Sequence, residues 1–529
     1  GLPMMITLVL SSNMKRMLKN NVLVRKMVGI ETAGSLNILF TDKTGTLTKG
    51  ALAVTEFVDG TLTSYHTVND IKNYHFLYHH LKNNCLYNNA SYLDENKKAI
   101  GGNITDRAIL EFIKTEKNKT YQKLKVVPFD SKSKFSSSLI DIGKKVNYLK
   151  GAPEKLLPYC KYYLEKTGEK SPIKNKLLIE KAISERTRLG ERAILLAYND
   201  NYQPELLERL TLIGIIYIKD EIRNEAKKAV SLVQNAGIKT IMITGDNKDT
   251  AVNIAKEIGL LNNEKDIVLT NTDLKKLSDS EIKTILPRLK VIARSMPQDK
   301  SRLVRIAKEE KLVVGMTGDG VNDAPALKKA DVGFAMGSGT EVAKEASDIV
   351  ILDDNFLSIA NAILYGRTIF KSIRKFIIFQ LTINLCAVSL SIIGPFVGIE
   401  TPVTVIQMLW INMIMDTLAG IAFSYEPPLK SYMEESPKTK DEKIMNSYMY
   451  SEIIFTGLYS SLLCLFFLKS SWIESIYRTA GTNKYLMTAF FALFIFMGIF
   501  NCFNARTPRL NLFSDLGKNK VFILIILFI

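Results

Sequence analysis

The chain has 529 residues, which is too long for one small hydrophobic core, so several domains are expected. A formal net charge of +17 suits nucleic acid, anionic lipid or a small anionic substrate as a partner. The lysines are dispersed and form no basic block with interleaved aromatic residues, which disfavours nucleic acid. The five cysteines form no CxxC pair, so we expect a reducing compartment and no thiolate site for soft metals.

The first chemical signal along the chain is the heptapeptide DKTGTLT at 42–48, which follows the apolar run 36–40. The run predicts a buried strand, and the turn after it can aim the Asp42 carboxylate into a crevice lined by backbone N–H groups. A carboxylate placed there can attack a γ-phosphoryl group and become an aspartyl-phosphate. An ordinary glycine turn is the alternative, which the seven specified positions disfavour.

Three further apolar runs, at 212–218, 240–243 and 312–316, end in acidic or glycine-rich turns, with helical patterns between them. Alternating strands and helices predict an open parallel sheet whose site lies at the carboxyl ends of the strands. The segment between the DKTGTLT turn and Asp220 has a different character. We expect it to form an inserted domain.

Four apolar segments are long enough to cross a bilayer, at 376–398, 403–423, 453–468 and 486–503. Lysines follow Glu426, whereas the turn near residue 400 carries neither lysine nor arginine. The positive-inside rule therefore places the Lys-rich body in the cytosol, beside a lipid bilayer. Both ends of the chain read as parts of further spans, so we expect it to belong to a longer protein.

Polar side chains lie inside two of these spans, with Asn384 in the first and Asn412 and Asp416 in the second. Asn412 and Asp416 are four residues apart and share a helix face. Such groups are costly in a bilayer and usually mark an ion path, although a lone Asn can serve a helix-to-helix hydrogen bond. Together their oxygen atoms predict a site for a hard cation such as Ca²⁺.

With TGD at 244–246 and TGDGVNDAPAL at 317–327, these motifs make the chain similar to the P-type ATPases over its whole length. The resemblance implies an α/β haloacid-dehalogenase-like phosphorylation domain with a parallel Rossmann-like sheet, an inserted α+β nucleotide-binding domain, and an α-helical transmembrane bundle. The expected ranges are 1–30 for the end of the fourth membrane helix and its stalk, 31–49 and 210–365 for the phosphorylation domain, 50–209 for the nucleotide-binding domain, and 366–529 for the fifth to the start of the ninth membrane helix.

Phosphoryl transfer needs a nucleophile, a divalent ion and donors to the phosphoryl oxygens. Asp42 is the expected nucleophile, and Mg²⁺ is expected on Asp42, Asp319 and the carbonyl of Thr44. Asp246 and Asp323 are expected to orient the metal and its waters. The expected donors to the phosphoryl group are Thr244, Gly245, Asn322 and Lys300, the last in a segment from Arg294 that is similar to the family's catalytic-lysine segment.

The resemblance places ATP in the inserted domain, where KGAPE at 150–154 matches the family's nucleotide-binding motif. Phe129 stands where the family has an aromatic that stacks on adenine, and a plain core role is the alternative. The DEIR turn at 220–223 replaces the family's DPPR-like turn. The positions expected to contact the cofactor are Lys150, Gly151, Phe129, Lys134, Asp106, Arg192, Arg223 and Arg294, together with Thr44, Thr244, Gly245, Asp246 and Lys300.

The stretch from Leu409 through Glu426-Pro427-Pro428 resembles the calcium-pump branch, particularly plasma-membrane-type and bacterial enzymes. Ala387 and Gly498 stand where the sarcoplasmic-reticulum type has the glutamates of a second site, so one Ca²⁺ per cycle is expected. The resemblance thus implies an ATP-driven pump that exports Ca²⁺ from the cytosol through phospho-Asp42, as a monomer, with counter-transported protons left open. Richness in Lys, Asn and Ile suggests the plasma membrane of a bacterium.

Three alternatives stay open. A secretory-pathway-like pump would carry Mn²⁺ as well as Ca²⁺, because both accept oxygen ligands. A membrane-tethered phosphohydrolase of the haloacid-dehalogenase kind usually has a second Asp where this chain has Thr44. A nucleotide sensor without catalysis would not need Asp42, Lys300 and Asp319.

Overall fold

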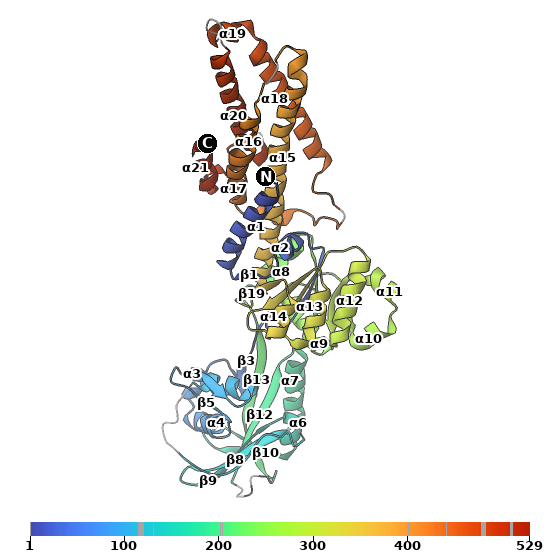
Figure 1. Cartoon of the computed structure of the whole chain (residues 1–529). Helices are drawn as coiled ribbons and strands as arrows, with labels where there is room; N and C mark the ends of the chain where they lie inside the picture. The colour runs from blue at the N-terminus through green and yellow to red at the C-terminus, as the bar shows by residue number, and fades with distance from the viewer. Residues whose placement is uncertain are drawn as a thin grey trace.

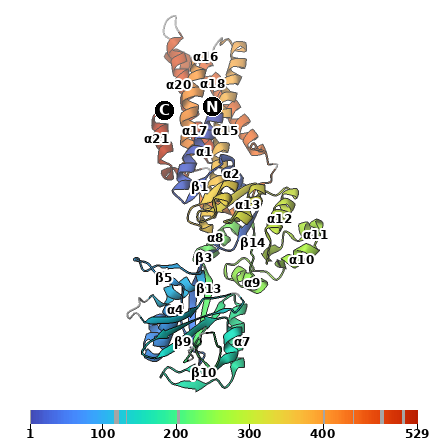
Figure 2. The same ribbon diagram turned by 60° about the horizontal axis from the view of Figure 1, so that its bottom comes forward.

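The computed structural model describes residues 2–114, 121–130, 132–200, 203, 205–399, 402–440, 442–477, 483–507 and 511–528. The molecule is elongated, with a helical bundle at one end, a sheet flanked by helices in the middle, and a second sheet domain at the far end (Figure 1). A view from another angle keeps this order of the three parts (Figure 2).

The middle domain is built on a sheet that has eight strands among the described residues, in the order β1-β19-β18-β17-β2-β14-β16-β15. Neighbouring strands are parallel except at the edge, where β1 runs antiparallel to β19. The strands are β1 (Val22–Val24), β2 (Ile38–Asp42), β14 (Lys239–Ile243), β15 (Ile267–Thr270), β16 (Leu289–Ala293), β17 (Val314–Gly318), β18 (Val332–Met336) and β19 (Ile349–Ile351).

Both faces of this sheet are buried, which explains why its strands read as continuous apolar runs. Ile38 and Phe40 of β2 enter one hydrophobic core, and Leu39 between them enters the other. The helices of this domain are α2 (Met27–Gly34), α8 (Ala226–Asn235), α9 (Lys248–Glu257), α10 (Asn271–Lys276), α11 (Asp279–Ile285), α12 (Pro297–Glu309), α13 (Ala324–Lys329) and α14 (Glu341–Ala346).

The inserted domain is a second sheet whose main path is β11-β10-β13-β12-β9-β8-β7, with β3 paired to β13 and to β4. Its strands are β3 (Thr48–Asp59), β4 (Ser64–Tyr65), β7 (Gln122–Val127), β8 (Phe135–Asp141), β9 (Lys145–Gly151), β10 (Cys160–Leu164), β11 (Lys170–Pro172), β12 (Arg192–Asn199) and β13 (Leu210–Ile222), and a separate hairpin joins β5 (Ser91–Leu93) to β6 (Ala99–Gly101). Its helices are α3 (Val68–Lys72), α4 (His75–Tyr87), α5 (Ile104–Ile113), α6 (Pro153–Leu156) and α7 (Lys176–Arg188).

One expected strand lies in a different sheet from the one predicted. The sequence predicts that the run 212–218 belongs to the parallel sheet. In the structure this run is part of β13, which pairs antiparallel with β12 and β3 of the inserted domain. The boundary expected at residue 210 therefore lies near the end of β13 at Ile222. A strand that is buried on both faces has the same continuous apolar sequence in either sheet. Hydrophobicity alone therefore could not show to which of the two sheets the run belongs.

Within the described ranges, four helical stretches are long and apolar enough to cross a membrane, and they cover all but a few terminal residues of the segments expected from hydropathy. They are α15 (Phe356–Phe396), a stretch made of α16 (Val405–Trp410), the π turn η3 (Ile411–Met415) and α17 (Asp416–Ser424), then α18 (Ser447–Lys469) and α20 (Lys484–Arg506). Beside them lie α1 (Leu2–Leu18), α19 (Ser471–Tyr477) and α21 (Lys520–Phe528).

The helix α15 joins the bundle to the middle domain without a break (Figure 1). Gly34 of α2 and Gly366 of α15 meet backbone to backbone, because a Cβ on Gly34 would lie 2.4 Å from the carbonyl carbon of Gly366. A side chain at either position would push the two helices apart. The glycine pair thus allows α2 of the sheet domain to pack closely against α15.

Candidate active site and ion site

Asp42 is the last residue of β2, in the interior of the parallel sheet between β17 and β14. Its backbone N–H donates to Thr317 Oγ1 at 2.9 Å, which ties the end of β2 to the end of β17. The backbone N–H of Lys43 donates to Asp42 Oδ1 at 2.7 Å. The chain then turns away through Gly45, which has a φ of 74° that suits glycine. The carboxylate is therefore presented at the carboxyl edge of the sheet.

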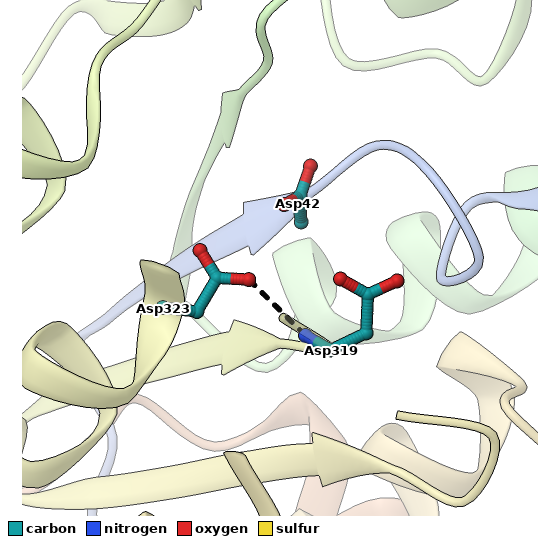
Figure 3. Close-up of side chains that lie close together, drawn as sticks. All are labelled: Asp42, Asp319 and Asp323. Carbon is teal, nitrogen blue, oxygen red and sulfur yellow. Dashed lines mark hydrogen bonds between the residues drawn. The ribbon is translucent and has the colours of Figure 1, made fainter. Parts of the chain in front are cut away.

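Asp42, Asp319 and Asp323 form a carboxylate cluster in which one oxygen of each lies within 4.8 Å of the others (Figure 3). Asp323 Oδ2 accepts hydrogen bonds from the backbone N–H groups of Asp319 and Gly320, at 3.2 and 3.1 Å. Burial, followed by the charges of Asp42 and Asp323, raises the pKa of Asp319 above its ordinary value. Crowded carboxylates of this kind favour a small hard cation, and the donor set fits Mg²⁺.

Lys300 enters this cluster from the first turns of α12 and is only 8% exposed. Its Nζ lies 2.7 Å from Asp42 Oδ2 and 2.7 Å from Asp323 Oδ1. Burial disfavours its charge, but the two carboxylates outweigh burial and raise the pKa of Lys300 above the ordinary value. The lysine therefore stays a cation against the Asp42 carboxylate.

Lys43 is a neighbour of the site whose contacts the sequence did not reveal. It is buried, and its Nζ lies 2.9 Å from Asp246 Oδ2 and 3.5 Å from Asp220 Oδ2. Of the two residues that the sequence predicts to orient the metal, Asp323 belongs to the carboxylate cluster, whereas Asp246 pairs with Lys43. The backbone N–H of Asp246 also donates to Thr244 Oγ1 at 3.2 Å, which orients that buried hydroxyl.

Three other predicted residues lie in turns directly after strands that end at this edge. Thr44 follows β2, Gly245 follows β14, and Asn322 lies in the 3₁₀ turn after β17. All three are exposed. The residues predicted to contact the phosphoryl group thus lie at the carboxyl ends of the central strands.

Seven of the residues predicted to contact the nucleotide line one cavity of about 1480 Å³. Phe129 is 56% exposed there, which excludes the alternative that it is a buried core residue. The middle domain contributes Asn247, Asp249 and Arg294 to the same cavity, which therefore opens between the two domains. The other predicted residues that line it are Asp106, Lys134, Lys150, Gly151 and Arg192.

Lys150 and Asp106 form a buried ion pair in the wall of this cavity, with Nζ and Oδ1 2.5 Å apart. Lys150, which the sequence predicts to contact the nucleotide, thus has its charge compensated by Asp106 within the protein. Arg223 lies beside the turn that follows Asp42. Its Nε and Nη2 donate to the carbonyls of Thr48 and Gly45, at 3.2 and 3.3 Å, so it braces the turn after Asp42.

The predicted ion ligands lie on α15 and on the broken helix beside it. Asp416, at the start of α17, is 2% exposed, and its Oδ2 accepts a hydrogen bond from Gln380 Nε2 of α15 at 3.0 Å. Asn384 and Asn412 are half-buried, the latter within the π turn η3. The sequence analysis did not single out Gln380, which contacts this predicted ligand, although a polar residue four positions before Asn384 in an apolar span is a detectable signal. Single π turns inside α-helices often occur at functional sites.

The fold and the sites define a membrane protein that carries a phosphoryl-transfer domain of the haloacid-dehalogenase kind. Three family models match, described as "P-type ATPase, cytoplasmic domain N" at residues 76–225, "haloacid dehalogenase-like hydrolase" at 303–363 and "Cation transporting ATPase, C-terminus" at 400–529. The chain belongs to the P-type ATPases.

Similar relatives include a putative calcium-transporting ATPase 13, plasma membrane-type, of Arabidopsis thaliana, which is 38% identical over 99% of this chain and 54% of its own length. Calcium-transporting ATPase PAT1 of Dictyostelium discoideum is 36% identical over 100% of this chain and 52% of its own length. Plasma membrane calcium-transporting ATPase 4 of Bos taurus is 34% identical over 100% of this chain and 48% of its own length.

The chain thus spans about half the length of the curated relatives it matches. These relatives come from eukaryotes, so the expectation of a bacterial plasma membrane finds no support.

Proposed function

We propose that this chain carries the phosphorylation, nucleotide-binding and ion-binding parts of a pump that uses ATP to export Ca²⁺ from the cytosol. The observation that carries this proposal is the position of Asp42, with one carboxylate oxygen on Lys300 and the other on a backbone N–H, beside Asp319 and Asp323. The names of the relatives, each a calcium-transporting ATPase, support the choice of ion.

In the phosphoryl-transfer step, a carboxylate oxygen of Asp42 forms a bond to the γ-phosphorus while the bond from that phosphorus to the bridging oxygen of ADP breaks. Lys300 holds positive charge against the reacting oxygens and needs no reorganisation to do so. Asp42, Asp319 and the carbonyl of Thr44 would hold Mg²⁺ with Asp323 beside them. When bound, this ion screens the phosphate charge from the carboxylates.

For the nucleotide, Phe129 supplies an exposed aromatic face for adenine, and the pairing of Lys150 with Asp106 keeps the cavity wall rigid. Arg294 and Asp249 lie at the opposite side of the same cavity, in the domain that carries Asp42. A nucleotide that spans this cavity would point its phosphates toward the carboxyl edge of the parallel sheet.

For the transported ion, Asn384, Asn412 and Asp416 offer the oxygen ligands that Ca²⁺ prefers, and we add Gln380 to this set. One ion per cycle is supported by the packing at Gly498, where an added Cβ would lie 3.0 Å from Met415 Cε. A glutamate side chain there would displace Met415. Because α15 runs unbroken from the sheet domain to Asn384, a shift of the sheet domain would move one wall of the ion site.

The cellular setting is proposed on the same basis. The plasma membrane follows from the names of the relatives, and a monomer is the simplest assembly. Protons are the proposed counter-ions, because a buried Asp416 that releases Ca²⁺ would be costly to leave charged. Mn²⁺ is a second cation that the same oxygen ligands accept.

The test is phosphorylation of the complete protein in membrane vesicles by labelled ATP, quenched in acid, across titrations of free Ca²⁺ and then of Mn²⁺. The Asp42→Asn variant is the control. A Ca²⁺-dependent label that hydroxylamine removes, and that Asp42→Asn lacks, supports the proposal. A label that does not respond to Ca²⁺ would leave the phosphoryl chemistry standing and overturn the assigned ion.

A further inference from the structure

The turn that follows α7 of the inserted domain lies against α9 of the middle domain. Asn253 Nδ2 of α9 donates a hydrogen bond to the backbone carbonyl of Arg188 at 2.7 Å. A Cβ added at Gly190 would lie 2.8 Å from Thr250 Cγ2, so the glycine lets this turn approach the helix closely. A hydrogen bond and a close backbone contact therefore hold the turn on α9.

Arg188, the last residue of α7, is exposed and lines the nucleotide cavity. Among the described residues, no carboxylate forms an ion pair with its guanidinium group. Arg186, two positions earlier, differs because its guanidinium group lies 2.5 Å from Glu56 Oε1 and 3.6 Å from Glu191 Oε2. Arg188 thus gives the cavity a positive charge that the described part of the protein does not compensate.

The helix that anchors this turn starts beside the proposed phosphorylation site. Asn247, the N-cap of α9, lines the same cavity as Arg188. Asp246, directly before it, pairs with Lys43, which is the residue next to Asp42. The contact with α9 therefore holds Arg188 on the side of the cavity that leads to Asp42.

We propose that Arg188 binds the phosphates of ATP and that Asn253 is the residue that positions it. A guanidinium group is always charged, and its planar set of donors matches the oxygen atoms of a phosphate. Arg188 belongs to the inserted domain, but its carbonyl is held by the middle domain. Its contact with the phosphates therefore depends on the docking of the two domains. This inference rests on the proposed function, which supplies ATP as the ligand.

The first test is equilibrium binding of ATP and of adenosine to the purified complete protein in detergent without Ca²⁺. Arg188→Gln should weaken ATP binding about tenfold, the usual effect of losing one charge-assisted hydrogen bond. Adenosine has no phosphate, so its affinity should not change. Arg209→Gln removes the same charge from an exposed position outside the cavity and should change neither affinity. Unchanged ATP affinity in Arg188→Gln would overturn the proposal, and so would equal losses for ATP and adenosine.

The positioning role of Asn253 is tested by combining two variants. Asn253→Ala should weaken ATP binding about fivefold, because it removes one neutral hydrogen bond that holds the turn. Added to Arg188→Gln, it should cause no further loss, since Asn253 acts on ATP only through Arg188. Losses that multiply in the double variant would overturn this role.

A crosslink tests whether the docked arrangement is the one that binds ATP. A Cβ at Gly190 would lie 3.4 Å from Thr250 Cβ, close to the spacing in a disulfide, so Gly190→Cys/Thr250→Cys should crosslink on mild oxidation. The native cysteines are buried, and Gly190→Cys alone controls for the strain of a side chain at a φ of 88°. The oxidised protein should bind ATP at least as tightly as the reduced one. Tenfold weaker binding on oxidation would overturn the proposal.

The binding measurements separate this proposal from the proposed function. Phosphorylation that does not respond to Ca²⁺, in a protein whose ATP affinities follow the pattern above, would count against the assigned ion alone. Ca²⁺-dependent phosphorylation with wild-type ATP affinity in Arg188→Gln would overturn only the role of Arg188.

Discussion

At the scale of single residues, the proposed phosphorylation site has more carboxylates than cations, so the position of each lysine decides which carboxylate is compensated. Lys300 is buried against both Asp42 and Asp323, whereas the other lysine nearby, Lys43, is used by Asp246 and Asp220. The two lysines therefore have separate tasks. Lys300 compensates Asp42, the proposed nucleophile, and Lys43 holds the turns around it.

Replacing Lys300 by Gln should lower the rate of phosphorylation by ATP by about 10²- to 10³-fold, the usual effect of removing one preorganised electrostatic donor. The loss of rate should exceed the loss of ATP affinity, because Lys300 lies at Asp42 and does not line the cavity proposed for the rest of the nucleotide. Quenched-flow labelling and equilibrium ATP binding separate the two quantities. Lys328→Gln, a change at an exposed lysine of α13, should alter neither.

Replacing Asp319 by Asn should raise the thermal stability of the protein in the absence of Mg²⁺ and abolish the further stabilisation that Mg²⁺ gives. The pKa of Asp319 is raised in the folded state above its unfolded value near 3.8, so its ionised form opposes folding at neutral pH. In the wild type, Mg²⁺ at 100 times its Kd should add about 2.7 kcal/mol. Its affinity should rise with pH as Asp319 loses its proton. Equal Mg²⁺ stabilisation of wild type and variant would contradict the assigned ligand.

At the scale of elements, a buried charge cluster ties the membrane helices together beside α17. Glu426, two residues after the end of α17, has Lys375 Nζ at 2.5 Å from Oε2 and Arg506 Nε at 3.1 Å from Oε1. Asn519 Nδ2 donates to Oε1 at 3.0 Å. The cluster therefore connects α15, α17, α20 and the start of α21. It also explains why Glu426, which the sequence reading valued only as part of a motif, is 3% exposed.

Glu426→Gln should destabilise the bundle by about 3–5 kcal/mol, because it leaves two buried cations without their anion. Burial opposes ionisation of Glu426, but Lys375, Asn519 and Arg506 lower its pKa below the ordinary value of 4.5. Its contribution is thus complete above pH 4.5 and is lost as the pH falls through the folded pKa. Chemical unfolding in detergent measures both effects. Glu434→Gln, at an exposed position of the same loop, should leave the midpoint unchanged.

At the scale of the whole molecule, β3 and β13 form a two-stranded connection between the inserted domain and the parallel sheet (Figure 1). Asp220 fixes this connection. Its Oδ2 accepts from Thr48 Oγ1 at 2.7 Å, and its Oδ1 accepts from the backbone N–H of Gly50 at 3.0 Å. Because the nucleotide cavity is shared by both domains, the geometry of this connection sets the distance from the nucleotide to Asp42.

Asp220→Ala should therefore lower phosphorylation by ATP about tenfold, equivalent to roughly 1.4 kcal/mol. Phosphorylation by acetyl phosphate should change little, since that small donor does not use the inserted domain. Acid-quenched labelling with each donor measures the ratio. The control is Glu221→Ala, which removes only an exposed ion pair with Lys49 and should behave as wild type. Equal losses with both donors would show that Asp220 acts at Asp42 itself.

The sequence by itself determined the fold class, the family and the membrane spans, because the strand-end motifs and the long apolar runs are local patterns. It also named Phe129 and Lys300, whose surroundings then proved to be a cavity and a carboxylate cluster. Only the tertiary structure decided the pairings: Lys43 with Asp246, Lys150 with Asp106, and Gln380 with Asp416.

The pair of Lys150 and Asp106 illustrates the physical reason for this division. The two residues are 44 positions apart along the chain, yet the fold brings them together as a buried ion pair. The placement of β13 has the same cause. The sequence of an apolar strand is compatible with either sheet, and only its neighbours in the structure show which sheet it joins. Hydrophobicity fixes which residues are buried, whereas the partner of a buried polar group depends on side chains that lie far away in the sequence.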